Sequence, residues 1–140
     1  GRLGLAPRSR QRVKQRIRAI TRRSRGVALE QVIRELNSFL TGWVTYFRYA
    51  ECRTWLRRLD EWIRRKLRCF RLKQCKRPQA LFNFLCQLGV PKRSARELAG
   101  TGHSWWRKSR SPQAQHAMHK AWFDSLGLVS LFQRYVRLQP

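Results

Sequence analysis

The stretch LDEWIRRKLRCFRLKQCKRP (residues 59–78) combines a regular apolar pattern with a high density of positive charge. On a helical wheel of about 100° per residue, the apolar side chains of residues 52–77 fall within one arc somewhat under half of the circumference. The opposite arc carries Arg53, Arg57, Arg58, Arg64, Arg65, Arg68, Arg71 and Lys76, with Glu61 as its acid. The sequence therefore predicts one long helix over 52–77 with a buried stripe and an outward-facing row of basic side chains.

The rest of the chain is also strongly basic. Its 140 residues include 32 Lys and Arg against 7 Asp and Glu, a formal net charge of +25 at pH 7. Such a charge opposes compaction unless an anion neutralises it, and the candidate partners are nucleic acid and an anionic membrane. A merely solvated helix face usually mixes in more Glu, and the neighbouring apolar stripes already offer the buried face protein partners. Both points favour nucleic acid, whose phosphates supply the counter-charge.

Six further segments have the pattern of helices, and no segment alternates as a strand does. They are residues 9–24, 28–49, 79–88, 94–99, 113–125 and 128–137. We expect an all-α fold, with a three-helix bundle over about 9–77 and a small helical module over 78–140, and we place the domain boundary between 1–77 and 78–140. Gly42 is expected to mark a close crossing of two helices, and Ser111 is expected to N-cap the helix that begins with Pro112.

The Cys, His, Asp and Glu residues do not have the spacing of a catalytic site or a metal site. Cys52, Cys69, Cys75 and Cys86 lack C-x-x-C spacing and are expected to be reduced thiols. His116 and His119 have no acid or Cys at compatible spacing, which leaves no metal site. Asp60 and Glu61 point about 100° apart on a helix, and Asp60 is expected to form a salt bridge with a neighbouring helix. We expect no catalytic residue, no metal and no cofactor on this chain.

The chain's ends and its apolar runs bear on location. No apolar run approaches the length of a transmembrane helix, and the N-terminal GRLGLAPRSR (residues 1–10) lacks a signal-type apolar region and an initiator Met. We expect a cytoplasmic fragment of a longer polypeptide, with no membrane partner. In the later loop SWWRKSRSP (104–112), Arg107, Lys108 and Arg110 are expected to contact nucleic acid, and one of the two tryptophans is expected to be buried.

Beyond this pattern, LNSFLTGWVTYFRYAE (36–51) followed by residues 59–78 resembles the maturase-specific domain of group II intron-encoded reverse transcriptases. That family carries an L-N-x-x-L-x-G-W-x-x-Y-F core, then L-D-x-W-I/V-R-R-R-L-R and a K-Q-x-K-x-P ending. The lead-in SRQRVKQRIRAITRRSRGVALEQVIREL (9–36) also matches, and GTGHSWWRKSRSPQAQHAMHKAWFDSLGLVSLFQRY (100–135) resembles the family's C-terminal block. The resemblance covers nearly the whole chain, in the same order.

The resemblance implies a helical thumb, also called the maturase or X domain, followed by a small DNA-binding segment. In the family these parts hold intron RNA and the RNA/DNA template–primer duplex, and so support splicing and target-primed reverse transcription. The chain departs from the family where LKQCKRP (72–78) lacks the usual tryptophans, and it has neither a Y-x-D-D pair nor an H-N-H cluster. The implied polymerase fingers and palm would be further partners from the same polypeptide, working in a bacterial cytoplasm or in an organelle.

Two other functions remain open at this stage. One is the thumb of a related, intron-less reverse transcriptase used in DNA repair or defence, and the other is a free-standing basic RNA-binding protein. In each case the residues expected to contact nucleic acid are Arg12, Arg16, Arg22 and Arg23 in the first helix, Arg57, Arg58, Arg64, Arg65, Arg68, Arg71 and Lys76 in the long helix, and Arg107, Lys108 and Arg110 in the later loop.

Overall fold

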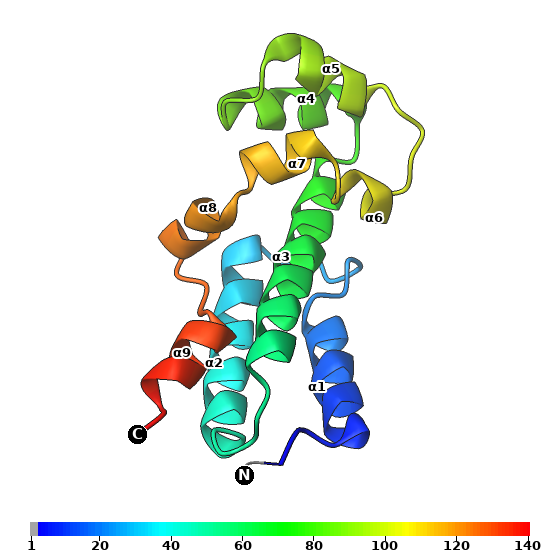
Figure 1. Cartoon of the computed structure of the whole chain (residues 1–140). Helices are drawn as coiled ribbons and strands as arrows, with labels where there is room; N and C mark the ends of the chain where they lie inside the picture. The colour runs from blue at the N-terminus through cyan, green and yellow to red at the C-terminus, as the bar shows by residue number, and fades with distance from the viewer. Residues whose placement is uncertain (1–2) are drawn as a thin grey trace. The chain divides into compact units, whose positions relative to one another are not determined.

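The computed structural model describes residues 3–140, and over that range the chain is all-α, which confirms the predicted fold class (Figure 1). The described residues form nine α-helices and no strand, with one isolated bridge between Gly4 and Glu51. None of these helices is long and apolar enough to cross a membrane.

The described residues pack into two compact units. The first comprises the described residues up to Ile63 together with Leu126–Pro140, and the second comprises Arg64–Ser125. The long helix α3, Arg53–Cys75, contributes residues to both. The functional division of the chain at residue 77 stays a prediction.

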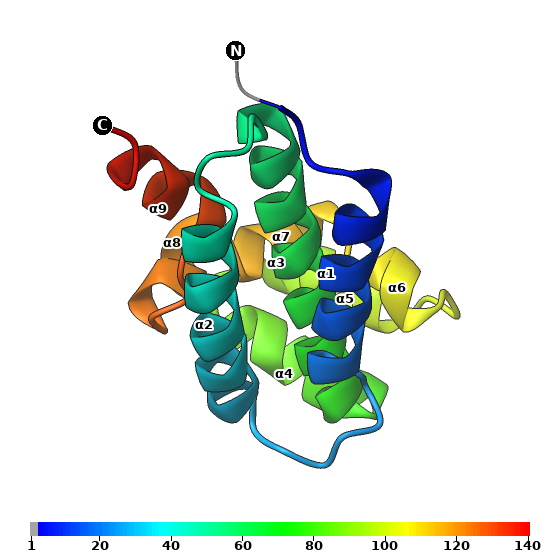
Figure 2. The same cartoon turned by 90° about the horizontal axis from the view of Figure 1, so that it is seen from below.

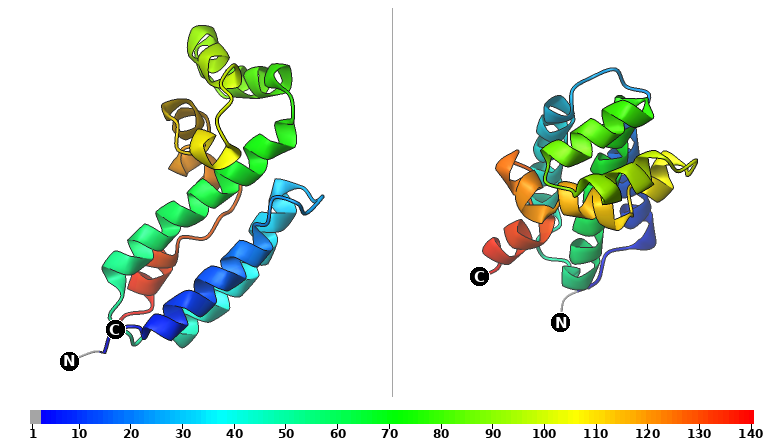
Figure 3. Two further views of the ribbon diagram at one scale, coloured as in Figure 1. Left: turned by 90° about the vertical axis from the view of Figure 1, so that its right-hand side faces the viewer. Right: turned by 90° about the horizontal axis from the view of Figure 1, so that it is seen from above.

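The first unit is built around α1 (Pro7–Ile20), α2 (Leu29–Tyr46) and the first part of α3, which lie side by side (Figure 2). The left panel of Figure 3 shows α1 and α2 running alongside each other. Each helix buries the apolar stripe that its sequence predicts, because residues three and four apart share a face. The buried side chains are Val13, Ile17 and Ile20 of α1, Leu29, Val32, Ile33, Leu36, Leu40 and Val44 of α2, and Leu56, Leu59 and Ile63 of α3.

The first unit also contains α9 (Leu131–Arg137), although the sequence analysis grouped these residues with 78–140. This helix packs on α2. Its Tyr135 is fully buried, and the Tyr135 hydroxyl donates to the carbonyl oxygen of Ala50 over 2.6 Å. The Asn37 side chain of α2 forms two hydrogen bonds with the segment that precedes α9. It donates to Gly127 O (2.7 Å) and accepts from Val129 N (2.9 Å).

Asp60 joins α3 to the start of α9. Its carboxylate accepts from Leu131 N over 2.9 Å, and from Phe132 N and the Ser130 hydroxyl over 3.0 Å each. The first N–H groups of a helix have no partner within the helix, and a carboxylate there also meets the positive end of the helix dipole. Asp60 therefore caps the start of α9, and the salt bridge expected of it stays a prediction.

Substituting Asp60 tests this cap. Asp60→Ala leaves the N–H groups of Leu131 and Phe132 without their acceptor in a buried place, and we expect a loss of about 2–3 kcal/mol in the free energy of unfolding. Asp60→Asn keeps one acceptor oxygen and is expected to lose less. Urea unfolding measures both, with Asp124→Ala as the control because the exposed Lys120–Asp124 pair contributes roughly 0.5 kcal/mol or less. Equal losses in Asp60→Ala and Asp124→Ala would contradict the cap.

The second unit contains the end of α3 and five shorter helices. They are α4 (Pro78–Gln87), α5 (Lys92–Ala99), α6 (Trp105–Lys108), α7 (Pro112–Ala117) and α8 (Lys120–Ser125). The right panel of Figure 3 shows α4 and α5 lying side by side as a helical hairpin. The hairpin turns at Gly89, whose φ of 90° is a conformation that favours glycine.

Three local signals set where the helices of this unit begin and end. Lys76 takes a φ of 60° after α3, and Pro78 then starts α4, as the sequence predicts. The Ser111 hydroxyl accepts from Ala114 N over 3.1 Å, which confirms the predicted N-cap.

The helix predicted over 113–125 was wrong, because it is interrupted at Met118 and His119. The Met118 carbonyl accepts from Arg68 Nε (2.8 Å), and His119 Nδ1 accepts from Trp122 N (3.1 Å) as the cap of α8.

Gly42 does not mark a crossing of helices, which corrects that expectation. It lies inside α2, is exposed, and a Cβ placed on it would meet no atom within 4 Å. Its cost to the helix is therefore not offset by close packing among the residues described.

Replacing this glycine should stabilise the protein. Gly42→Ala is expected to raise the free energy of unfolding by about 0.5–1 kcal/mol, because alanine loses less backbone entropy in a helix. The matched control is Gly100→Ala, whose Cβ would lie 3.3 Å from Arg96 O and should bring no gain. Denaturant midpoints measure both. A loss of stability in Gly42→Ala would show that the glycine is needed for packing.

Candidate nucleic-acid interface

Six of the basic residues predicted to contact nucleic acid are exposed in the first unit. They are Arg12 and Arg16 of α1, Arg22 and Arg23 after it, and Arg57 and Arg58 of α3. Two of them also lie over aromatic rings, with Arg16 Cζ 5.9 Å from the centroid of Phe39 and Arg57 Cζ 4.2 Å from that of Phe132. Such contacts fix the direction of the side chain while its charged end stays in water.

A second basic row of α1 lies against the tryptophans of α3. Arg10 Cζ is 5.4 Å from the ring centroid of Trp55, and Lys14 Nζ and Arg18 Cζ are each 5.4 Å from that of Trp62. Together with Arg58, these cations and rings form a mixed strip that we call the α1–α3 strip. Phosphates bind guanidinium and ammonium groups, and bases stack on exposed rings, so the strip has both kinds of group that a polynucleotide binds.

Arg10, Lys14 and Arg18 were not among the residues predicted from the sequence to contact nucleic acid. Their spacing of four residues was a usable signal, because it places all three on one side of the apolar stripe of α1. Trp55 and Trp62 belong to the apolar arc of residues 52–77, which was predicted to be buried, but both are half-buried. A tryptophan at the edge of a stripe, next to a row of cations, is as consistent with a binding surface as with a core.

A cavity of about 270 Å³ lies at one end of the α1–α3 strip. It is lined by Arg10, Glu51, Cys52, Arg53, Thr54, Trp55 and Arg58. Burial, and to a lesser degree the charge of Glu51, raise the pKa of the Cys52 thiol to about 11. The thiol is therefore protonated at neutral pH, which makes it a poor nucleophile.

The long helix does not present one continuous outward row, because Arg65, Arg68 and Arg71 are half-buried against other parts of the second unit, and whether they contact nucleic acid stays a prediction. The guanidinium of Arg65 donates to Trp106 O (2.9 Å) and to the Ser109 hydroxyl (3.2 Å), and its Cζ lies 3.7 Å from the centroid of the Trp106 ring. Arg68 donates to Met118 O and lies 5.5 Å from the Phe123 ring. Arg71 lies 4.1 Å from the Phe84 ring. This part of the basic face, which belongs to the second unit, is therefore covered by other residues of the same unit.

Burial has an electrostatic cost for two of these groups. It lowers the pKa of Arg65, with a smaller effect from the charge of Arg110. Burial and the neighbouring Arg64 charge lower the pKa of Arg68 to about 10, so this guanidinium stays charged at neutral pH. Carbonyl acceptors and aromatic faces offset part of that cost.

The other predicted residues of the second unit differ in exposure. Arg107, Arg110 and Lys76 are exposed, and Arg64 is half-buried. Lys108 is buried at 8% exposure, with its ammonium 4.5 Å from the Trp105 ring centroid. Trp105 and Trp106 are both half-buried. Whether these basic residues contact nucleic acid stays a prediction.

Acidic partners account for few of these charges. Arg25 is paired with Glu35 over 2.8 Å, and its guanidinium holds the pKa of that carboxyl below its usual value. With 7 acids for 32 Lys and Arg, most cations can have no carboxylate of their own. Among the described residues, no cluster of three or more His, Cys, Asp or Glu could hold a metal ion.

The inward arginines should contribute to stability and the outward ones should not. Arg65→Ala removes two hydrogen bonds and a stacked ring, so we expect a loss of about 1–3 kcal/mol in the free energy of unfolding. Arg58→Ala, on the same helix but exposed, should change it by less than about 0.5 kcal/mol. Urea unfolding of the two variants decides the matter. If Arg65→Ala were as stable as Arg58→Ala, the inward placement of Arg65 would be wrong.

Comparison with known proteins adds one finding. The family model "Group II intron, maturase-specific domain" matches residues 10–85, which is more than half of the chain. The match includes most of α1, all of α2 and α3 and most of α4, and therefore the whole α1–α3 strip. No curated protein matches the chain.

Proposed function

Because the chain belongs to the family of group II intron maturase-specific domains, we propose that it is the nucleic-acid-binding thumb of a group II intron-type reverse transcriptase. In this role it holds structured intron RNA and the RNA/DNA template–primer duplex, and so supports splicing and target-primed reverse transcription. The matched region is the maturase-specific part and not the polymerase site. The fingers and palm of the same polypeptide would supply the polymerase chemistry.

The observation that carries the proposal is the α1–α3 strip, flanked by exposed Arg12 and Arg16. Arg10, Lys14 and Arg18 lie beside Trp55 and Trp62, and no carboxylate among the described residues forms an ion pair with them. A polyphosphate backbone would neutralise these charges and release its condensed counterions, which is the main source of affinity for nucleic acid. Guanidinium groups also suit phosphates because they can form paired hydrogen bonds.

The strip favours recognition of shape over reading of bases. A helical surface with charges along its length can follow the phosphates of an A-form helix, while the deep major groove of such a helix excludes side chains. Specificity for intron RNA would then come from the positions of phosphates in the folded RNA. The resulting ribonucleoprotein would work where the intron is transcribed, in a bacterial cytoplasm or in an organelle.

Removing charge from this face tests the proposal. The triple variant Arg12→Gln, Arg16→Gln and Arg58→Gln should weaken binding to a group II intron RNA and lower the slope of log affinity against log salt by about 2–3, since each lost phosphate contact removes about 0.9. Filter binding across a salt series measures both. The matched control is Lys92→Gln, Arg134→Gln and Arg137→Gln, which removes the same charge at other exposed sites.

Three results would contradict the proposal. The first is no RNA binding at moderate salt, and the second is the same loss in the triple variant and its control. The third is an affinity for the intron RNA that falls with salt in step with that for an unrelated structured RNA of equal length. This last result would mean that the chain is a thumb that binds duplexes in general, without specificity for intron RNA.

A further inference from the structure

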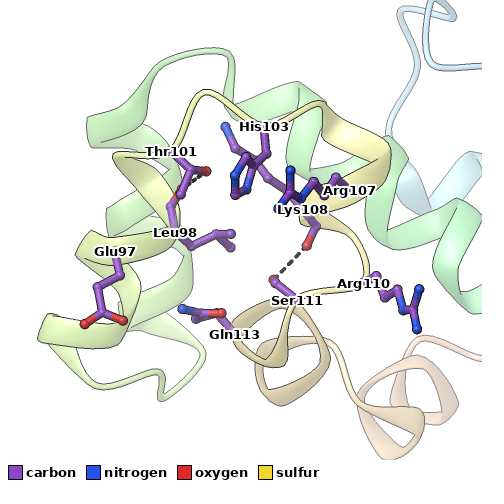
Figure 4. Close-up of a pocket in the computed structure, with 9 residues that line it drawn as sticks. All are labelled: Glu97, Leu98, Thr101, His103, Arg107, Lys108, Arg110, Ser111 and Gln113. Atoms are coloured by element: carbon purple, nitrogen blue, oxygen red, sulfur yellow. Dashed lines mark hydrogen bonds between the residues drawn. The ribbon is translucent and has the colours of Figure 1, made fainter.

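The second unit contains a pocket of its own, formed by α5, the loop after it, α6 and the start of α7 (Figure 4). Its volume of about 420 Å³ falls in the range of small-molecule sites. None of its lining residues belongs to the α1–α3 strip. The strip therefore gives this pocket no role, and the inference below rests on the proposed function only in that Arg107, Lys108 and Arg110, which line the pocket, are expected to contact nucleic acid.

The pocket is electrostatically one-sided. Arg107, Lys108 and Arg110 line it on one side, while Glu97 lies across from them (Figure 4). The Glu97 carboxylate is 66% exposed and lies 3.9 Å from Arg93 outside the pocket, so it does not neutralise the basic side. The basic side is arranged to receive an anion.

Lys108 is the strongest sign of a built site. The residue is only 8% exposed and lines the pocket, yet no carboxylate or other hydrogen-bond acceptor is bonded to its ammonium among the residues described. The Trp105 ring, 4.5 Å away, is its observed partner. A cation–π contact offsets only part of the cost of withdrawing a charge from water, and an anion in the pocket would offset more of it.

We propose that this pocket binds one unpaired nucleotide, with its phosphate held between Arg107 and Lys108. The volume is much larger than a phosphate needs, so the rest of the ligand must fill it. Leu98 supplies an apolar wall, and His103 lines the pocket with an exposed ring on which a base can stack. A base paired in a duplex cannot enter, because its hydrogen-bonding edge and both faces are already occupied. The nucleotide is therefore an unpaired one, such as a strand end or a nucleotide extruded from a helix.

The small-molecule test uses the intact chain and adenosine 5′-monophosphate, adenosine and inorganic phosphate as probes. The pocket predicts that the monophosphate binds most tightly, because it alone fills both the charged side and the apolar side. Isothermal titration calorimetry measures the three dissociation constants. The proposal is overturned if adenosine or inorganic phosphate binds as well as the monophosphate, or if the monophosphate does not bind.

A charge variant locates the binding. Arg107→Gln should raise the dissociation constant of the monophosphate by roughly tenfold, which is the effect of losing one charge-assisted hydrogen bond. Arg107 is exposed, so the change should leave the fold intact. The control Lys92→Gln removes the same charge from an exposed residue of α5 that does not line the pocket. An equal loss of affinity in both variants would mean that the monophosphate binds through overall charge, and it would overturn the proposed site.

Three RNA hairpins identify the source of the nucleotide. One has a blunt end, one carries an unpaired 5′-phosphorylated nucleotide, and one has a single-nucleotide bulge. Tighter binding of the second hairpin assigns the pocket to a strand end, and tighter binding of the third assigns it to an extruded nucleotide; Arg107→Gln should abolish either gain. No gain for either hairpin over the blunt one would overturn the proposal. The triple variant of the first unit should weaken all three alike, so failure here is distinct from failure of the proposed function.

Discussion

The constraint that shapes this structure is an excess of guanidinium groups over carboxylates. Most of these groups must find another partner or remain in water. Cations cannot be buried without a partner, and 7 acids cannot partner 32 Lys and Arg. The chain instead uses aromatic faces and backbone carbonyls. Arg65 on Trp106, Arg68 at Met118 O and Arg71 on Phe84 are the inward examples, and all three lie in the second unit. The groups that remain outside are then available to a polyanion.

The helix α3 serves both purposes along its length. In the first unit its apolar stripe faces α1 and α2. Its Asp60, one of the few acidic residues of the chain, caps the start of α9. In the second unit its basic side is covered by α6, α7 and α8 through Trp106, Met118 and Phe123. Its self-repulsion is thus reduced in two ways: by internal acceptors near its C-terminal end, and by the proposed polyphosphate partner near its N-terminal end.

Much of the fold could be predicted from the sequence because helical periodicity is a local property. The stripes of α1, α2 and α3, the Ser111 cap and the turn before Pro78 all follow from residues close together in the chain. The misses were non-local. Asp60 caps a helix about seventy residues away, and the break at Met118 depends on Arg68 from another helix. A helical wheel shows which face is basic but not which other segment covers it.

The same limit applies to the candidate site. The wheel of α3 selected Arg58, which is exposed, together with Arg65, which stacks on a ring, because both lie on one arc. It passed over Arg10, Lys14 and Arg18, whose relation to Trp55 and Trp62 arises only when α1 lies beside α3. The sequence pointed to Arg107, Lys108 and Arg110 but not to the pocket that they line, because three short helices and a loop form it.

Arginine-selective labelling would test the division between inward and outward groups most directly. The intact chain would be treated with phenylglyoxal, free and bound to a group II intron RNA, and the modified residues would be identified by mass spectrometry. The account predicts that Arg12, Arg16 and Arg58 are labelled in the free protein and protected by the RNA, while Arg65 and Arg68 are labelled little in either state. Strong labelling of Arg65 and Arg68 in the free protein, with protection by RNA, would contradict it.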